Sequence, residues 1–464
     1  MSDPDLDYAS AADLAAMVHA RRVSPVELVR NALARLDVVE PHLNAFVHRA
    51  DEPALRQAEA AERAIVAGEP LGPLHGVPVS VKDLIDVAGM PCRYGSLTMK
   101  DHVPADDAPS VARLRAAGAI VIGKTTTSEF GYRGYTKSLV HGNTANAWDL
   151  ARTPGGSSGG AVSSVAAGVT PIALGTDGGG SIRSPAAFTG LFGVKAQTGR
   201  VPVFPPSATP TLAHVGPFAR TARDAALLLS AIAGPDFGDH TSLLPAADWN
   251  ARPDLAALRV AFSPTLGYAR VNPEVAAIVR AAVEALAADL PRIEEVVEVC
   301  PDPAEILATE FIAGCSARLG DAVERTPELI DPPLLGAIRS LRARSAGDYA
   351  RVLRERVHHR ERMRRFFDRH DVLLTPTTPV AAWPLENEGV PPGHEDATVW
   401  SYFTYPFNLS GQPAASVPCG FTAGGLPVGL QIVVRPLEDP LLLSLAGLAE
   451  ERLGGFSRRP TLPA

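Results

Sequence analysis

The sequence predicts an α/β protein with a largely parallel sheet, and three stretches carry that prediction. Residues 109–123 (PSVARLRAAGAIVIG) are typical of a capped helix that stops at Gly118 and leads into a buried strand over 119–122. Residues 77–81, with valine at every second position, and residues 172–174 have the apolar character of two further buried strands. Helices that alternate with buried strands are the pattern of a sheet with helical crossovers.

The chain on either side of these stretches is mostly helical. Residues 10–50 predict two helices, and the second starts at Ser24, where Ser24-Pro25-Val26-Glu27 supplies a cap, a first-turn proline and a capping box. Residues 221–233, 273–290 and 303–369 predict further helices, whereas residues 371–435 return to strands and turns.

The organisation of the chain indicates one domain. We find no internal repeat and no linker, so we expect a single domain over residues 1–464. Its core would lie at about 74–233, and a variable, mainly helical insertion would lie at about 264–370.

Composition narrows the class of protein. A net charge of −8 weighs against nucleic acid as a partner, and the alternating charges of residues 349–370 favour a solvated helix face. No apolar run approaches the roughly 20 residues of a membrane helix, and the first ten residues lack an apolar leader. Four scattered cysteines form no CxxC pair and no cluster with histidine. We therefore expect a cytoplasmic monomer or homodimer without metal, cofactor or membrane partner.

The stretch from Pro154 to Arg183 concentrates the candidate chemistry, because it places Ser157 and Ser181 in two glycine-rich segments. The first segment contains G-x-S-x-G, but no strand precedes Ser157, and the last downstream histidine, His394, lies in a Pro/Gly-rich loop. Both observations weigh against a hydrolase nucleophile elbow, which needs a preceding strand and then an acid and a histidine. A phosphate-binding loop also fails, since no Gly-Lys-Ser/Thr follows the glycines. In the second segment, successive glycine N–H groups can converge on an anion beside Ser181, as acyl transfer requires.

Lys82 is a further candidate because it directly follows an apolar strand. A charge there is costly unless it is paired or neutralised. On spacing alone, a lysine whose amine reaches water is the simpler interpretation. The serine segments instead favour a base that activates a hydroxyl.

Several motifs together give the chain a family resemblance. It resembles the amidase signature enzymes in GVPVSVKD around Lys82, PGGSSGG around Ser157 and GTDGGGSIR around Ser181. Flanking matches are GKTTTSEFG, LFGVKAQTGRV, VGPFARTARDAALLL, DVLLTPTTP, SVPCGF and GLPVGLQIV. The resemblance spans nearly the whole chain and implies a large mixed, mostly parallel twisted central sheet covered by helices on both faces.

The resemblance also implies roles for individual residues. Ser181 would be the nucleophile, Lys82 the base, and Ser157, on a non-prolyl cis peptide after Gly156, the bridge between them. Backbone N–H groups from Gly178, Gly179 and Gly180 through Ser181 would form the oxyanion hole. Ser158, Asp177 and Arg183 would support the site.

The candidate substrate contacts are less specific. Gly131 matches a substrate-lining position and Tyr132 follows it. Trp400 and Tyr402 belong to an aromatic cluster in residues 394–406, which is either one wall of the pocket or plain core. The chain reads Thr-Thr-Thr-Ser over 125–128 where many relatives read Thr-Asn-Met-Pro, so the acyl pocket is expected to differ.

The implied function is an amidase that hydrolyses a C–N bond of a small or aryl carboxamide through a serine acyl-enzyme. Carbamates (urethanes) and esters are further candidate substrates. The alternative is the glutamine-hydrolysing A subunit of a tRNA-dependent amidotransferase, although the middle third of the chain lacks a recognisable motif of that family's glutamine site. A catalytically dead binding protein is disfavoured, because Lys82, Ser157 and Ser181 are all present.

Overall fold

One mixed sheet runs through the molecule. The computed structural model describes residues 2–249, 251, 253–394, 399–456 and 458–462. Within them, the main sheet has eleven strands in the order β1-β3-β2-β6-β8-β7-β12-β13-β11-β9-β10. In chain order they are β1 (Phe46–Arg49), β2 (Pro78–Lys82), β3 (Ile120–Thr125), β6 (Ile172–Asp177), β7 (Phe192–Lys195), β8 (His214–Ala219), β9 (Val260–Phe262), β10 (Ile293–Glu295), β11 (Val372–Pro376), β12 (Ala414–Phe421) and β13 (Pro427–Val434). A separate short ribbon pairs β4 (Lys137–Ser138) with β5 (Gly142–Asn143).

The α/β class and the mixed sheet are confirmed, but the expected excess of parallel pairing needs correction. Among the described strands, parallel pairing is limited to β2 with β3 and β6, and to β9 with β10 and β11. The remaining neighbours pair antiparallel. A five-residue turn joins β12 to β13, and a connection this short can link only antiparallel strands.

Helices cover both faces of the sheet, as expected. They are α1 (Pro4–Asp7), α2 (Ala11–His19), α3 (Pro25–Leu43), α4 (Asp51–Ala67), α5 (Pro109–Ala116), α6 (Gly159–Ala166), α7 (Arg183–Thr189), α8 (Ala222–Ile232), α9 (Pro273–Leu286), α10 (Ala304–Leu319), α11 (Ala322–Arg325), α12 (Pro332–Arg342), α13 (Ala346–Arg369), α14 (Tyr405–Ser410) and α15 (Asp439–Leu453). The capping box at the start of α3 is present.

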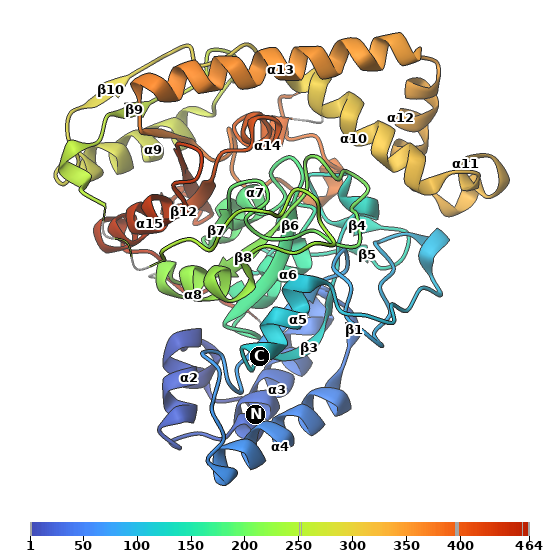
Figure 1. Cartoon of the computed structure of the whole chain (residues 1–464), viewed down its shortest axis with the longest axis vertical. Helices are drawn as coiled ribbons and strands as arrows, with labels where there is room; N and C mark the ends of the chain where they lie inside the picture. The colour runs from blue at the N-terminus through green and yellow to red at the C-terminus, as the bar shows by residue number, and fades with distance from the viewer. Residues whose placement is uncertain (1, 250, 252, 395–398, 457, 463–464) are drawn as a thin grey trace.

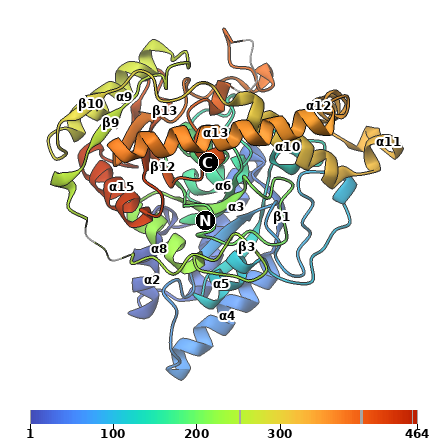
Figure 2. The ribbon, with the colours of Figure 1, turned by 45° about the horizontal axis from the view of Figure 1, so that its top comes forward.

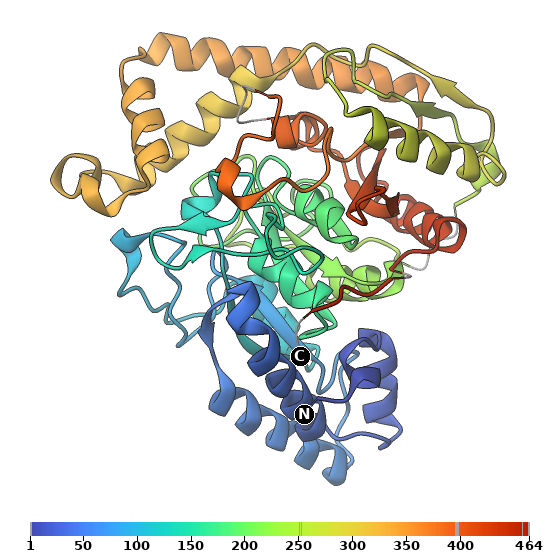
Figure 3. The same cartoon turned by 180° about the vertical axis from the view of Figure 1, so that it is seen from behind.

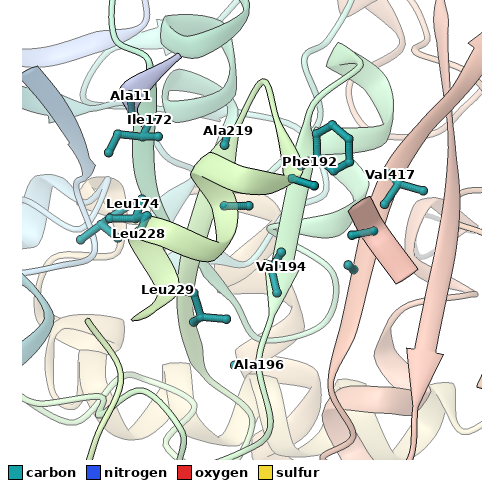
Figure 4. Close-up of a cluster of buried hydrophobic side chains, with 14 of the residues drawn as sticks. Ala11, Ile172, Leu174, Phe192, Val194, Ala196, Ala219, Leu228, Leu229 and Val417 are labelled. Carbon is teal, nitrogen blue, oxygen red and sulfur yellow. The ribbon is translucent and has the colours of Figure 1, made fainter. Parts of the chain in front are cut away.

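The strands divide their side chains between two cores, because successive residues point to opposite faces. Val121, Ile172 and Leu174 pack with α2, α5, α8, α9 and α15. Figure 4 shows Ile172 and Leu174 beside Ala11 of α2 and Leu228 of α8. Ile122 and Ala173, which alternate with them, pack on the other face with α3 and α6.

The molecule is arranged in tiers along its long axis (Figure 1). The N-terminal helices α2 to α4 lie at one end, and α3 and α4, which both contact β3, are seen from behind in Figure 3. At the other end, α13 spans the width of the molecule, with α10 beside it (Figure 2). Among the described residues, no helix is long and apolar enough to cross a membrane.

Candidate active site

Lys82 ends a central strand, and its amine meets three hydroxyl groups. Strand β2 lies between β3 and β6, so the Lys82 side chain is fully buried. Its Nζ lies 2.7 Å from the Ser157 Oγ, 2.8 Å from the Ser158 Oγ and 2.8 Å from the Thr176 Oγ1. Thr176 belongs to the neighbouring parallel strand β6, so the carboxyl ends of the two strands place these groups together.

Burial lowers the pKa of the Lys82 amine well below its usual value, although the charge of Asp177 opposes this shift. A neutral amine has two N–H groups and one lone pair, and here it has three hydroxyl partners. When the amine is neutral, one of the three hydroxyls must therefore donate a hydrogen bond to the lone pair of Nζ. The Ser158 hydroxyl is committed elsewhere, because it donates to the Thr176 carbonyl at 3.2 Å. The hydroxyls of Ser157 and Thr176 are therefore the candidate hydrogen-bond donors to Nζ.

Ser157 lies on the turn that leads into α6, and the peptide bond between Gly156 and Ser157 is cis, as the resemblance implied. Gly131 lies directly behind it. A Cβ added at Gly131 would be 3.1 Å from the Ser157 Oγ and 3.1 Å from the Leu84 Cδ1. Gly131 also has a φ of 76°, in the left-handed region that favours glycine.

Ser181 follows the three glycines that connect β6 to α7. The Gly180 N–H donates to Asp177 Oδ1 at 2.7 Å and the Ile182 N–H to Asp177 Oδ2 at 3.3 Å. The Gly180 donor is therefore engaged within the protein, unlike the free donor expected from the sequence. Among the described residues, the N–H groups of Gly178, Gly179 and Ser181 donate no hydrogen bond.

A buried ion pair fixes the glycine turn. Arg183 Nε and Nη2 each lie 3.0 Å from an oxygen of Asp177, and both side chains are fully buried. Burial opposes ionisation of Asp177, but the Arg183 guanidinium, the Asn408 amide and the charge of Lys195 together outweigh it and hold the pKa of that carboxyl well below its usual value. The remaining Arg183 donors reach the Thr404 carbonyl, Gln431 and Asn408, so the guanidinium is fully satisfied.

Comparison with known proteins shows the family to which the chain belongs. A family model described as Amidase matches residues 27–443. The chain belongs to the amidase signature family. An acylamidase from Rhodococcus erythropolis is 37% identical, with 96% of each chain covered. The A subunit of the glutamyl-tRNA(Gln) amidotransferase from Moorella thermoacetica is 35% identical, with 99% of each covered.

Solved structures of the amidase signature family share the whole fold. The structure of a bacterial aryl acylamidase has a TM-score of 0.90 at 29% identity, with 96% of each chain covered. A 6-aminohexanoate cyclic dimer hydrolase complexed with substrate has a TM-score of 0.89 at 29% identity, covering 98% of this chain and 99% of its own. The fold of this amidase is therefore that of amidase signature enzymes over nearly its whole length.

Two pockets of the amidase meet at Ser181. The first, which we call the proline pocket, is lined by residues 202–209 together with Ser157 and Ser181. The second, which we call the helical pocket, is lined by four residues of α10, namely Leu307, Ala308, Phe311 and Ile312. Gly131, Ser181 and Phe311 line both pockets. Ser157 and Ser181 thus face one cavity, although no hydrogen bond joins their hydroxyls among the described residues.

The structure separates the candidate substrate contacts. Tyr132 and Trp400 line the helical pocket. Tyr402 lies in neither pocket lining and instead packs edge-on against Tyr268, with ring centroids 6.0 Å apart. Within the expected aromatic wall, residues 395–398 lie outside the described residues.

Sequence reasoning missed several groups of this site. Thr176 lies within hydrogen-bond distance of the Lys82 amine, Asn408 donates to Asp177, and Phe311 lines both pockets. Thr176 stands directly before Asp177 in the motif GTDGGGSIR, so its position near Lys82 could have been inferred from the sequence. Asn408 and Phe311 come from distant segments, and no local pattern marks them.

Proposed function

We propose that this amidase hydrolyses the C–N bond of a small or aryl carboxamide through an acyl-enzyme on Ser181. The Ser181 hydroxyl attacks the carbonyl carbon while its proton passes to Ser157, whose own proton passes to the neutral Lys82 amine. The tetrahedral intermediate collapses, and the leaving amine receives the proton back along the same relay. Water then hydrolyses the ester, which restores Ser181 and releases the acid.

The observation that carries the proposal is the contact between the Lys82 amine and Ser157. A lysine acts as a base only in its neutral form, and burial lowers the pKa of Lys82 in that direction. Ser157 joins this base to the cavity that holds Ser181. Ser181 is 4% exposed as a residue, and its hydroxyl is reached through that cavity.

The N–H groups of Gly178, Gly179 and Ser181 are the proposed oxyanion hole. They lie next to the nucleophile and have no acceptor among the described residues. Each such donor lowers the barrier by about 2.7–4 kcal/mol in enzymes where one has been removed. Gly180 has a positioning role in this proposal, because its N–H holds the Asp177 carboxylate.

The pocket linings support an apolar or aromatic substrate. Leu307, Phe311, Ile312 and Trp400 present apolar surface in the helical pocket beside Ser181. The similarity to the Rhodococcus acylamidase and to the aryl acylamidase structure supports the same class. Carbamates and esters expose the same kind of carbonyl, so they are proposed as secondary substrates.

Substrate screening tests the proposed activity. The purified chain is expected to hydrolyse an anilide, whereas Ser181→Ala and Lys82→Met should each lose at least about a thousandfold in kcat. Release of the aniline gives the rate, and circular dichroism checks that the variants are folded. Wild-type turnover by folded Ser181→Ala would contradict the assignment.

A second candidate is the glutamine-hydrolysing component of a tRNA-dependent amidotransferase, which the 35% identity to the Moorella protein over nearly full length favours. Glutamine as the preferred substrate, with ammonia released, would support this candidate. Copurification with partner proteins of such a complex would support it further. Anilide hydrolysis by the isolated chain without glutamine hydrolysis would count against it.

A further inference from the structure

The lining of the proline pocket includes two buried polar side chains that the proposed reaction does not use. Asp86 is 4% exposed and follows strand β2 by four residues. Ser110 is fully buried in the first turn of α5. Both line the pocket that contains Ser157 and Ser181.

Each of these two groups lacks a partner that it would be expected to have. The Ser110 hydroxyl makes no hydrogen bond among the described residues. Asp86 Oδ1 accepts a hydrogen bond of 2.6 Å from the Tyr94 hydroxyl, but no cation lies within 4 Å of the Asp86 carboxylate in the described part of the chain. Buried polar groups normally have hydrogen-bond partners, and buried charges normally have counterions.

The nearby cations are engaged elsewhere. Lys124 Nζ donates to the Ile85 carbonyl at 2.6 Å and to Cys92 Sγ at 3.1 Å, and it lies 3.6 Å from Asp83. Its charge also acts on Asp86, but the two side chains do not form an ion pair among the described residues. The exposed Arg318 lies over the Tyr94 ring, with its guanidinium carbon 5.2 Å from the ring centroid. Arg318 therefore stands at the pocket wall and does not pair with Asp86.

We propose that Asp86 and Ser110 form a subsite for a positively charged amino group of the substrate, remote from the scissile amide. This inference rests on the proposed function, and it names the substrate class as amides that also carry an ammonium. An ammonium would donate one hydrogen bond to the free Asp86 Oδ2 and another to the Ser110 Oγ. Tyr94, whose hydroxyl donates to the other carboxylate oxygen, also lines the pocket.

Two matched series of substrates test the subsite. In one, the acyl chain of an anilide ends in an ammonium, a hydroxyl or a carboxylate; in the other, the same three groups end the leaving amine. In at least one series, kcat/KM for the ammonium compound should exceed that for the hydroxyl compound roughly ten- to hundredfold. Asp86→Asn should reduce this ratio to about threefold or less, and Ser110→Ala should reduce it in part.

Asp106→Asn is the matched control, because Asp106 is exposed, close in sequence to α5 and absent from the pocket lining. It removes the same charge and should leave the ratio as in the wild type. Equal rates for ammonium and hydroxyl compounds in both series would overturn the subsite. An ammonium preference that persists in both Asp86→Asn and Ser110→Ala would also overturn it.

Binding separates this inference from the proposed reaction. Calorimetric titration of Ser181→Ala with the same compounds reports the subsite without turnover. Tighter binding of the ammonium compound, lost when Asp86→Asn is added, supports the subsite even if no compound is hydrolysed, in which case the proposed function alone fails. Equal affinity for the ammonium and hydroxyl compounds contradicts the subsite even if the chain is an active amidase.

Discussion

Burial of the Lys82 amine costs the hydration of a charged group, and it also lowers the pKa of that amine. The amine is buried without an ion pair among the described residues, and three hydroxyls replace the water that it has lost. This environment favours the neutral form, which is the form that would accept a proton from Ser157 in the proposed reaction. Burial therefore supplies the chemical property on which the proposed mechanism depends.

The pH dependence of the rate tests the ionisation of Lys82. Because the pKa of the amine is lowered well below its usual value, kcat/KM should rise from acid pH as the amine loses its proton. It should then reach a plateau well below the pH at which an ordinary lysine titrates. Steady-state rates on a neutral anilide measure this. A rate that climbs only above about pH 10 would indicate an ordinary lysine.

Gly131 tests how closely the site is packed around Ser157. In Gly131→Ala, the new Cβ would lie 3.1 Å from the Ser157 Oγ, so kcat should fall at least about tenfold through displacement of that hydroxyl. Gly142→Ala is the control, because Gly142 has a similar φ of 78° with no atom within 4 Å of the added Cβ. Equal kcat values for the two variants would contradict the packing argument.

At the scale of elements, a buried carboxylate joins the loop before Gly131 to the helical insertion. Glu129 accepts hydrogen bonds from the Ser96 hydroxyl at 2.5 Å and from the Asp331 N–H, just before α12, at 2.6 Å. Asp331 is in turn paired with Arg133. The loop that lines both pockets is thus connected to α12 on its outer side.

Stability as a function of pH tests this connection. Burial raises the pKa of Glu129 to about 7, so its contribution to stability is complete below its usual pKa and is lost as pH rises towards 7. Between pH 4.5 and pH 8, the wild type should lose on the order of 3 kcal/mol relative to Glu129→Gln. Chemical unfolding at a series of pH values measures the difference.

The matched control for Glu129→Gln is Glu59→Gln, since Glu59 is exposed. Its free energy of unfolding should follow the pH dependence of the wild type. Parallel pH curves for wild type and Glu129→Gln would contradict the assigned ionisation.

Local signals made many elements predictable. The capping box of Ser24 and Glu27 acts within one helical turn, and the helix before Gly118 ends where its glycine indicates. The sequence predicts more parallel strand pairs than the sheet contains, because the direction of a strand depends on which distant segment pairs with it. The motifs identified Lys82, Ser157 and Ser181, whereas Asn408 touches Asp177 across 231 positions of sequence. No local periodicity encodes such a contact.

At the scale of the whole molecule, one sheet joins the core to the insertion. Strands β9 and β10 belong to the segment after the core. β10 pairs with β9, β9 pairs with β11, and β11 pairs with β13. Phe311 of the insertion also walls both pockets. We propose that residues 1–464 form a single domain, because neither part buries its own sheet edge without the other.

Calorimetry tests the single-domain proposal. One shared sheet predicts a single heat-absorption peak in a calorimetric scan. Scans with added ligand use Ser181→Ala, so that the ligand is not hydrolysed. A stabilising ligand should shift the whole peak to a higher temperature. Two separated peaks, of which a ligand shifts only one, would show that the insertion unfolds independently.

The most direct test of the central claim is the site of acylation. The wild-type chain is mixed with a slowly deacylating ester or anilide, quenched in acid, and examined by intact mass and peptide mapping. The account predicts one acyl group per chain, located on Ser181, and no adduct in Ser181→Ala. An acyl group on Ser157 or on any other side chain would contradict it.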